Sequence, residues 1–576
     1  MDVSKSHAEN IENVSSDQGD GMPTKSMGPI MRSREEDIGV WQCARRFKTV
    51  SLIAMTAAFS ASLDGYQINL NAGIVSNKGF IRQMASPGTS IIAGKYISAW
   101  GGVQSAGQTV GQVVCLLDLH ACSEKWLTTL QLLQYATERF GRKIAFYIIW
   151  LDIVVSIFIE SFATRWDHWL AAKLFSGMGV GMLQSTLPLY LSEIAPTQLR
   201  GFYINAYSFW FVVGQIFASV ALQKLSAQDP YEFRVPIYTQ WAMVGIIILI
   251  FAFIPESPWW LVSKGKIDKA AKVLTRCNGN VEGYSVDEQI VCHLSLLIVI
   301  VFERSFNIHQ EVMTATIAEE RLVAERNSEE GTWAVFQGRN RLRFCIAAWP
   351  KITQQLVGLS VFNTYATYFF QYAGSDDPFM VTVILSCVQL ISMMMTAVTT
   401  DKFGRRPLTI YPYAVTSVSL LCLGIIGCFD YTKPSTSSLL IFFACLATLS
   451  TTGASAIGYA YAAEIPQQRL RAKTAGWALA SSNMLATMFS FCTPLMINNA
   501  PVSQWGVKTG FFFAGTGTFA VAIAWFILPE VTRRTPAEID EMFEKKVNLR
   551  KFKGYVTEVQ LRSNEQREDH EMVITG

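Results

Sequence analysis

Charged residues are scarce in this chain. Asp, Glu, Lys and Arg make up 16% of its 576 residues, whereas hydrophobic residues make up 50%. Soluble globular domains carry about 25% charged residues, so this composition excludes an ordinary soluble protein and favours a membrane chain. The net charge is only +3, and the sequence has no soluble basic face, so no nucleic-acid partner is expected.

The motifs of enzymes and of ATP-driven pumps are also missing. No Walker loop or other nucleotide-binding motif occurs, which argues against ATP-driven transport. The 11 cysteines are scattered, without a CxxC pair or metal spacing, so we interpret them as apolar filler and expect no metal site and no cofactor. No nucleophile–base constellation appears in a soluble segment, so an enzyme is not expected.

Long apolar runs are what the chain has instead. Twelve runs approach the roughly 20 residues that span a hydrocarbon core, six on each side of a polar central segment. They lie at 49–75, 95–117, 144–163, 168–191, 203–223, 238–254, 344–370, 379–399, 407–428, 438–462, 474–497 and 509–528. The sequence therefore predicts an all-α membrane protein with twelve transmembrane helices in two six-helix halves.

These spans divide the chain into five parts. They are a disordered N-terminal tail (1–48), a first six-helix half (49–254), a central loop (255–343), a second six-helix half (344–528) and a C-terminal tail (529–576). The first 40 residues contain no apolar core of a signal peptide, so we expect the first span to act as the targeting signal. Basic residues gather on one side of the spans, and basic loops stay cytoplasmic. Both termini and the central loop are therefore predicted to be cytoplasmic.

Two blocks, 114–131 and 291–310, interrupt this pattern. The first places charges where a span should end, and the second drops an apolar run too short to cross a bilayer into the central loop. Both blocks begin with Val-Cys and end in Gln, which GTATGT and CAG, the expected ends of a short fungal intron, can encode. We interpret both blocks as unspliced introns translated in frame. The alternative is a pair of genuine insertions.

Three motifs occur once in each half, in the same order. The hexad ERFGRK at 138–143 is matched by DKFGRR at 401–406. An acidic residue followed by an Arg seven positions later occurs in both halves, and so does a Pro-Glu pair after the last span. Ordered repeats of this kind are typical of two parallel six-helix halves and of a protein that moves a solute across a bilayer.

Together with these hexads, four segments carry a resemblance to a known family: SEIAPTQLRG (192–201), PESPWWL (255–261), AEIPQQRLRAKTAG (463–476) and PEVTRRT (529–535). From about residue 50 to 545 the chain resembles the sugar porter family of the major facilitator superfamily (MFS), and most closely its fungal α-glucoside or maltose-type permeases. The resemblance implies the MFS fold and a monomeric fungal sugar transporter in the plasma membrane.

In this family the repeated motifs mostly build cytoplasmic gates. A Glu at one helix end can pair with an Arg on the next segment, and a network that closes in one state biases the equilibrium between states. The residues expected to gate the cytoplasmic face are Glu138, Arg142, Glu193, Arg200, Glu256, Asp401, Arg405, Arg406, Glu464, Arg471 and Glu530. The alternative for some of the basic members is the positive-inside rule alone.

Polar residues inside spans indicate a substrate path, because they are costly in hydrocarbon. The family's QQ-x-x-G pair faces a central cavity and bonds sugar hydroxyls, which suits an amide because it both donates and accepts. Members of the family stack an aromatic side chain on the sugar ring, and Tyr459 occupies that position here. The substrate-binding residues that the resemblance implies are Gln354, Gln355, Asn363, Tyr365, Tyr459, Asn483 and Gln215. Packing between helices is the alternative role for the amides.

Span one bears on proton coupling. Proton symporters of the family carry an Asp where this chain has Gln67, and Asp64 lies one helical turn earlier, where maltose-type permeases carry an additional acid. Lys173 in span four replaces the family's Arg and is the expected partner of Asp64. Glu160, near the outer end of span three, is expected at the membrane interface.

The sequence thus favours a proton symporter for an α-glucoside or another oligosaccharide. The substrate is a neutral sugar, and the other partners are protons and the lipid bilayer. A passive facilitator for a hexose or polyol is the second interpretation. A sugar sensor and an exporter of a cluster-encoded metabolite remain as alternatives.

Overall fold

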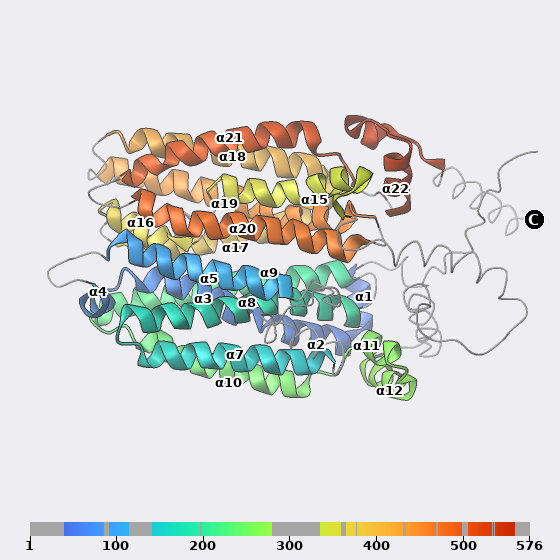
Figure 1. Cartoon of the computed structure of the whole chain (residues 1–576), viewed down its shortest axis with the longest axis horizontal. Helices are drawn as coiled ribbons and strands as arrows, with labels where there is room; N and C mark the ends of the chain where they lie inside the picture. The colour runs from blue at the N-terminus through green and yellow to red at the C-terminus, as the bar shows by residue number, and fades with distance from the viewer. Residues whose placement is uncertain are drawn as a thin grey trace, which may run out of the picture.

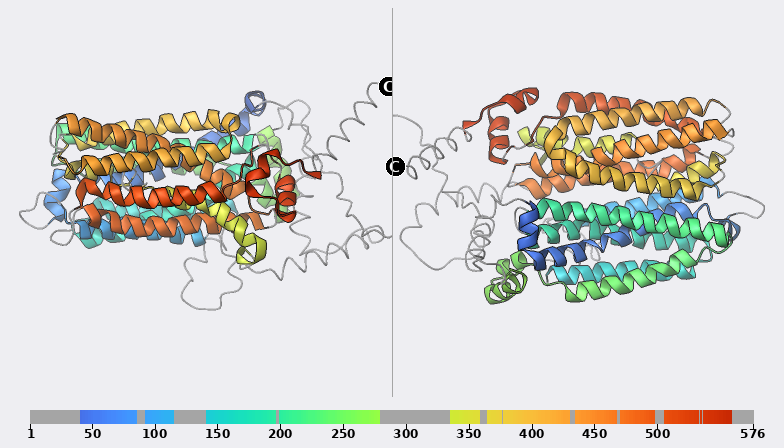
Figure 2. Two further views of the ribbon diagram at one scale, coloured as in Figure 1. Left: turned by 90° about the horizontal axis from the view of Figure 1, so that it is seen from above. Right: turned by 180° about the vertical axis from the view of Figure 1, so that it is seen from behind.

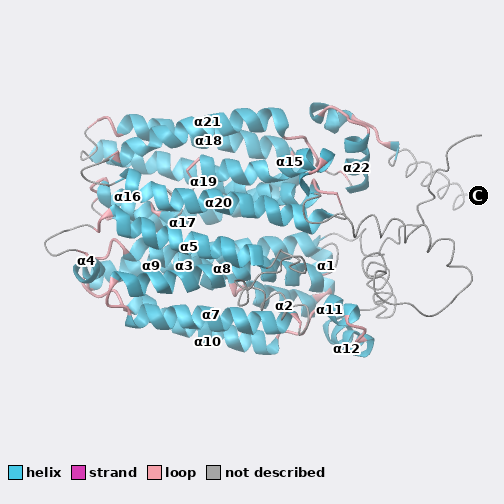
Figure 3. Cartoon of the chain, in the orientation of Figure 1, coloured by secondary structure: helices cyan, strands magenta, loops and turns pink. Residues whose placement is uncertain are grey.

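The computed structural model describes residues 40–85, 92–114, 141–195, 199–278, 335–358, 364–375, 377–429, 434–467, 470–497, 505–532, 534 and 536–558. Helices are the only regular structure in these segments (Figure 3). They run side by side in two bundles, one above the other in Figure 1. The block 291–310 lies outside the described residues, as does 114–131 beyond Val114.

The first bundle is built from the first half of the chain. Its helices are α1 (Val40–Arg46), α2 (Lys48–Ala58), α3 (Ala61–Ile74), α4 (Lys78–Met84), α5 (Gly94–Val114), α7 (Arg142–Phe162), α8 (Trp166–Ile194), α9 (Arg200–Gln228) and α10 (Val235–Phe253). Two short helices, α11 (Pro258–Ser263) and α12 (Ile267–Asn278), follow at one end of the bundle (Figure 1). We call this end of the molecule the α12 side and the opposite end the α4 side.

The second bundle repeats the arrangement. Its helices are α15 (Gly338–Leu356), α16 (Ala366–Tyr372), α17 (Pro378–Phe403), α18 (Arg405–Ile426), α19 (Pro434–Glu464), α20 (Arg471–Ile497) and α21 (Thr509–Ile527). Helix α22 (Pro536–Glu544) lies beyond them on the α12 side, as the turned views also show (Figure 2). Short 3-10 turns occupy Gly506–Lys508 and Leu549–Gly554.

Seven described helical segments are long and apolar enough to cross a membrane. They are Arg142–Phe162, Phe202–Gln228, Val235–Phe253, Pro378–Thr396, Arg405–Ile426, Ser435–Ala462 and Gly506–Ile527. The expected spans one and seven are each divided into two shorter helices. The other three, in α5, α8 and α20, carry polar residues that contact other helices, and this lowers their hydropathy.

Span seven divides at the glycine of QQ-x-x-G. Helix α15 ends at Leu356, and Gly358 adopts a φ of +76°, which favours glycine. A Cβ at Gly358 would meet the Phe513 ring of α21 at 2.8 Å, so the residue also permits a close approach. The helix resumes at Ala366.

The most extensive contacts between the bundles are those of α5 with α20 and of α9 with α17, and α16 also contacts α3. Hydroxyl side chains bridge the first two pairs. The distance between their oxygens is 2.9 Å for Ser105 and Ser490, 3.2 Å for Thr109 and Thr487, and 3.2 Å for Ser219 and Ser386. These bridges run from the α4 side towards the middle of the molecule, so the two halves are held together there.

Candidate functional site

A cluster of charges joins three helix ends on the α12 side of the first half. The Glu256 carboxylate accepts hydrogen bonds from the backbone N–H groups of Arg142 (2.8 Å) and Lys143 (3.2 Å), at the start of α7. An anion there is stabilised by the helix dipole. The Arg142 guanidinium pairs with Glu193, near the end of α8, at 3.0 Å. Burial raises the pKa of the Glu256 carboxyl, and hydrogen bonds from backbone N–H groups oppose that rise.

The second half contains the same cluster. Glu530 accepts from the backbone N–H groups of Arg405 (3.1 Å) and Arg406 (3.0 Å), at the start of α18. Arg405 pairs with Glu464, at the end of α19, at 2.7 Å. We call these two arrangements the first and second helix-end clusters. The repetition extends from the sequence motifs to their contacts.

Glycine and tyrosine complete each helix-end cluster. Gly141 (φ +110°) and Gly404 (φ +93°) precede the capped helices, and a Cβ at either would contact the capping carboxylate. Tyr190 and Tyr461 donate hydrogen bonds to the carbonyls of Pro255 (2.8 Å) and Pro529 (2.9 Å). Our sequence analysis missed both tyrosines. They lie three residues before Glu193 and Glu464, so comparison of the two halves could have found them.

The described partners of the two glutamates differ from the expected ones. Each pairs with the Arg of the hexad, because the hexad starts the helix that packs beside it. The expected partner was the Arg seven residues further along the chain. The side chains of Arg200, Arg471 and Asp401 lie outside the described residues, as does the whole of Glu138.

The expected pair of Asp64 and Lys173 is wrong. The Lys173 ammonium forms its ion pair with Glu160 at 2.8 Å, and both side chains are fully buried. Glu160 lies in the last turn of α7, as expected near one end of span three, and its side chain is buried between helices. The reason is geometric: α7 and α8 are packed neighbours, so Glu160 and Lys173 meet within the bundle.

Asp64 instead accepts a hydrogen bond from the Tyr207 hydroxyl at 3.1 Å. Its other oxygen has no hydrogen-bond partner among the described residues. Tyr207 belongs to α9, which packs against α17 of the second half. Asp64 is therefore hydrogen-bonded to a helix that contacts the second half.

Hydrogen bonds link Gln67 to the pair of Lys173 and Glu160 through a second amide, that of Gln240. The Ser176 hydroxyl donates to Gln67 at 2.9 Å, Gln67 donates to the Gln240 carbonyl oxygen, and Gln240 donates to Glu160 at 3.1 Å. We call these five residues the buried polar network. Four helices, α3, α7, α8 and α10, supply it. The sequence analysis did not assign a role to Gln240, because a single amide in an apolar span belongs to no recognisable motif.

Four polar side chains gather around α15 in the second half. Lys351 donates to the side-chain oxygens of Gln354 (3.1 Å) and Ser455 (3.3 Å), and its ammonium lies 3.3 Å from the centre of the Tyr459 ring. Tyr459 is 49% exposed although it lies between the halves, so part of its ring borders accessible space. The side chain of Gln355 forms no hydrogen bond among the described residues.

Two further predicted substrate residues, Asn483 and Tyr365, lie at contacts between helices. Asn483 on α20 donates to Gln112 on α5, which in turn donates to Gln184 at 2.8 Å. The Tyr365 hydroxyl donates to the backbone carbonyl of Ser490 at 2.7 Å. In this conformation both predicted residues serve packing.

Two predicted substrate residues remain. Gln215 is fully buried in α9, the helix that packs on α3. Asn363 lies outside the described residues.

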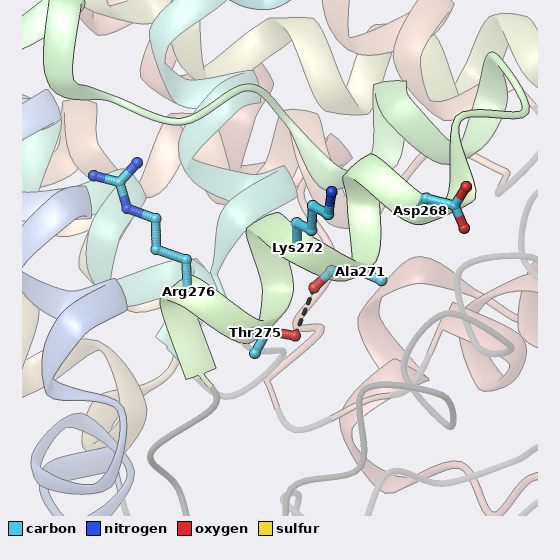
Figure 4. A pocket seen from close by; sticks show the side chains of 5 residues that line it. All are labelled: Asp268, Ala271, Lys272, Thr275 and Arg276. Carbon is cyan, nitrogen blue, oxygen red and sulfur yellow. Dashed lines mark hydrogen bonds between the residues drawn. The ribbon is translucent and has the colours of Figure 1, made fainter.

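An open hollow on α12 is separate from these groups. Its lining is Asp268, Ala271, Lys272, Thr275 and Arg276, all on one helix outside the two bundles (Figure 4). Its described lining belongs to α12 alone, outside the two bundles, so we assign it no part of a path between the halves.

Comparisons with known proteins agree with this architecture. Residues 53–543 match the family described as "Sugar (and other) transporter". The general alpha-glucoside permease of Saccharomyces cerevisiae is 28% identical over 91% of this chain and 80% of its own. The yeast maltose permease MAL31 is 29% identical over 74% of this chain and 66% of its own. The inward open xylose transporter XylE from E. coli superposes with a TM-score of 0.63, at 19% identity, over 85% of this chain and 99% of that one.

Proposed function

The chain belongs to the sugar (and other) transporter family, and from this premise we propose that it carries an α-glucoside or another oligosaccharide by alternating access, together with a proton. Membership makes it a multi-pass membrane protein with the twelve-helix fold of its structural neighbours. The finer assignment, to oligosaccharides, follows the similarity to permeases named for α-glucosides and maltose.

One observation carries the proposal. The amide of Gln355, which forms no hydrogen bond among the described residues, the amide of Gln354 and the half-exposed Tyr459 come from α15 and α19, which pack against each other. An amide pair beside an aromatic face suits a polyol, because the amides donate to and accept from its hydroxyls. We therefore place the substrate there, near the middle of the molecule.

The two helix-end clusters are proposed as the cytoplasmic gates. Each ties three helix ends within one half, and we propose that these contacts form in one state and weaken in the other when the α12 side opens or closes. We also propose that both termini and the central loop lie in the cytoplasm and that the protein resides in the plasma membrane, as the basic loops and the resemblance to fungal permeases led us to expect. The contacts of α5 with α20 and of α9 with α17 then form the closed outer side of an inward-facing state.

Asp64 is the residue we propose to carry the proton. It is fully buried, has one oxygen free of hydrogen bonds among the described residues, and borders the contact between the halves through Tyr207. Lys173 acts with Glu160 and not with Asp64. The coupling role first assigned to Lys173 therefore becomes one of holding α7 against α8.

A passive facilitator is the second candidate, and Gln67 is the observation that favours it. Gln67 stands where symporters of the resembled family keep an acid, and its amide is engaged by Ser176 and Gln240. A neutral residue that is already hydrogen-bonded cannot carry a proton at that position.

Uptake in a yeast strain without hexose and maltose transporters tests the proposal. Labelled maltose, other α-glucosides, hexoses and polyols are compared with and without a protonophore. Proton symport predicts accumulation of an α-glucoside that the protonophore abolishes. Asp64→Asn should then lose accumulation but keep sugar exchange. Uptake that ignores both the protonophore and external pH would establish the facilitator instead.

A further inference from the structure

Lys351 is a buried cation that the proposed function leaves unused. It lies in the middle of α15, three residues before Gln354, and is 4% exposed. Its stem packs against Gly458 of α19, where a Cβ would come within 3.3 Å of the lysine side chain. The sequence places this lysine inside span seven, next to the residues that we assign to the substrate.

No acidic side chain balances this charge among the described residues. Two donors of the Lys351 ammonium go to the neutral oxygens of Gln354 and Ser455, and the Tyr459 ring lies across the group at 3.3 Å. The other buried lysine, Lys173, shows the contrast because it has Glu160 at 2.8 Å. Burying an ammonium in the membrane interior without a counter-charge costs free energy, so a negative group beside Lys351 would be stabilising.

The surroundings of Lys351 indicate where a counter-charge can come from. The Tyr459 ring lies directly against the ammonium, and 49% of the surface of this tyrosine is accessible. A ligand that displaces the ring reaches the ammonium together with the Gln354 amide. An ammonium has three donors, and only two of them are hydrogen-bonded within the part of the chain that the structure describes, which leaves one for an oxygen of the ligand.

We propose that the transported molecule carries a carboxylate as well as hydroxyl groups, and that Lys351 is its counter-charge. Within the saccharides of the proposed function, the preferred substrate is then a polyhydroxylated carboxylic acid, such as an aldonic or uronic acid. The inference rests on the proposed function, because it uses the same transport site. It assigns the hydroxyls to Gln354 and Gln355 and the carboxylate to Lys351.

Matched probe pairs test this with the full-length protein reconstituted in lipid vesicles. Maltobionate is compared with maltose, and D-glucuronate with D-glucuronamide, which differs from it mainly in charge. Equilibrium binding and exchange across the vesicle are both measured. We expect each carboxylate to bind at least about tenfold more tightly than its uncharged partner, the scale of one charge-assisted hydrogen bond.

Substitutions of Lys351 test whether this residue causes the preference for a carboxylate. Lys351→Gln should bring each pair close to equal affinity, and Lys351→Arg should retain a preference for the carboxylate because the charge is kept. Lys224→Gln, at an exposed lysine of α9, is the matched control and should behave as wild type. The comparison of probes on the wild-type protein requires no variant, so a folding defect at Lys351 leaves the test intact.

The possible outcomes separate a failure of this inference from a failure of the proposed function. Exchange of maltose with no binding of either carboxylate overturns the inference and leaves the proposed function standing. Tight binding of a carboxylate without exchange supports Lys351 as an anion site and contradicts transport. Equal affinities in the wild type, an unchanged preference in Lys351→Gln, or no binding of any probe would overturn the inference.

Discussion

Gln355 is the side chain on which the binding proposal depends most directly. Its amide sits on the last turn of α15, beside Gln354 and one turn after Lys351, and it forms no hydrogen bond among the described residues. An amide can be left without a partner in a membrane bundle where a polar ligand or water reaches it. This is the residue-scale feature that separates a substrate contact from a packing contact such as that of Asn483.

Gln355→Ala should raise the apparent KM for the transported substrate. Loss of a ligand hydrogen bond of about 1–3 kcal/mol corresponds to roughly 5- to 150-fold. The measurement is initial uptake against substrate concentration, with surface expression determined in parallel. Gln228→Ala, at an exposed position on α9, is the control. Unchanged transport of every accepted substrate would refute the assignment.

The Glu160–Lys173 pair makes a stability prediction. Glu160→Gln leaves the Lys173 ammonium buried without its counter-charge, which should cost about 3–5 kcal/mol. The variant should therefore show a lower melting temperature in detergent and reduced surface expression. The double variant Glu160→Gln with Lys173→Met removes both charges and should recover most of the loss. A double variant no more stable than the single one would show that the pair is not the cause.

At the scale of elements, the two helix-end clusters explain why the motifs are duplicated. In each half a Glu after the last span caps the start of a helix, and the first Arg of that helix pairs with a Glu at the end of another. Partly exposed pairs of this kind contribute about 0–1 kcal/mol each, too little to explain the motif through stability alone. Such a pair can still control transport if it is stronger in one state of the transporter than in the other, since that difference shifts the equilibrium between the two states.

Arg405→Ala should reduce transport turnover more than it reduces equilibrium binding of the substrate. The substitution removes a contact that we propose differs between states and leaves the binding residues of α15 untouched. Binding to purified protein and exchange in vesicles give the two quantities. Lys551→Ala, at an exposed lysine near the C-terminus, serves as the control. Equal losses in both measurements would point to misfolding or to a direct binding role.

The blocks 114–131 and 291–310 make a prediction about the elements themselves. If both are translated introns, the mature transcript joins Val113 to Leu132 and Ile290 to Glu311. The first junction gives span two a continuous apolar end, and the second gives the central loop one amphipathic helical pattern. Sequencing the transcript measures this directly. A cDNA that retains both blocks would show that they are genuine parts of the protein.

At the scale of the whole molecule, transport requires the two halves to separate on the side where they now meet. The oxygens of Ser105 on α5 and Ser490 on α20 are 2.9 Å apart across that contact. Side chains this close lie within reach of a disulfide if both are replaced by cysteine. The pair therefore offers a reversible lock on the α4 side.

The variant Ser105→Cys with Ser490→Cys should lose transport on oxidation and regain it on reduction. A disulfide there holds α5 against α20 and prevents the outward-facing state. Uptake is measured before and after oxidant, and each single cysteine variant controls for the native cysteines. Full activity of a demonstrably cross-linked protein would mean that this contact does not open during transport.

The sequence by itself determined the family and the twelve-helix fold, both of which the comparisons confirm. Apolar runs of membrane length, hexads in matching positions and a QQ-x-x-G motif are all readable along the chain, because each depends on residues close in sequence. Seven described helices are long and apolar enough to cross a membrane, and the duplicated motifs support the pairing of the two halves. The amides of Gln354 and Gln355 were likewise found from their motif.

Only the tertiary structure decided which charges meet. Glu193 pairs with Arg142, and Lys173 with Glu160, because α7 and α8 pack side by side, and spacing along the chain cannot reveal which helices are neighbours. Lys351 is the clearest case. In the sequence it is one lysine in a polar stretch of span seven, and it becomes informative only when α19 brings a tyrosine ring to its ammonium and no described acid accompanies it. A missing counter-charge is a property of three-dimensional packing, because any residue of the chain could have supplied it.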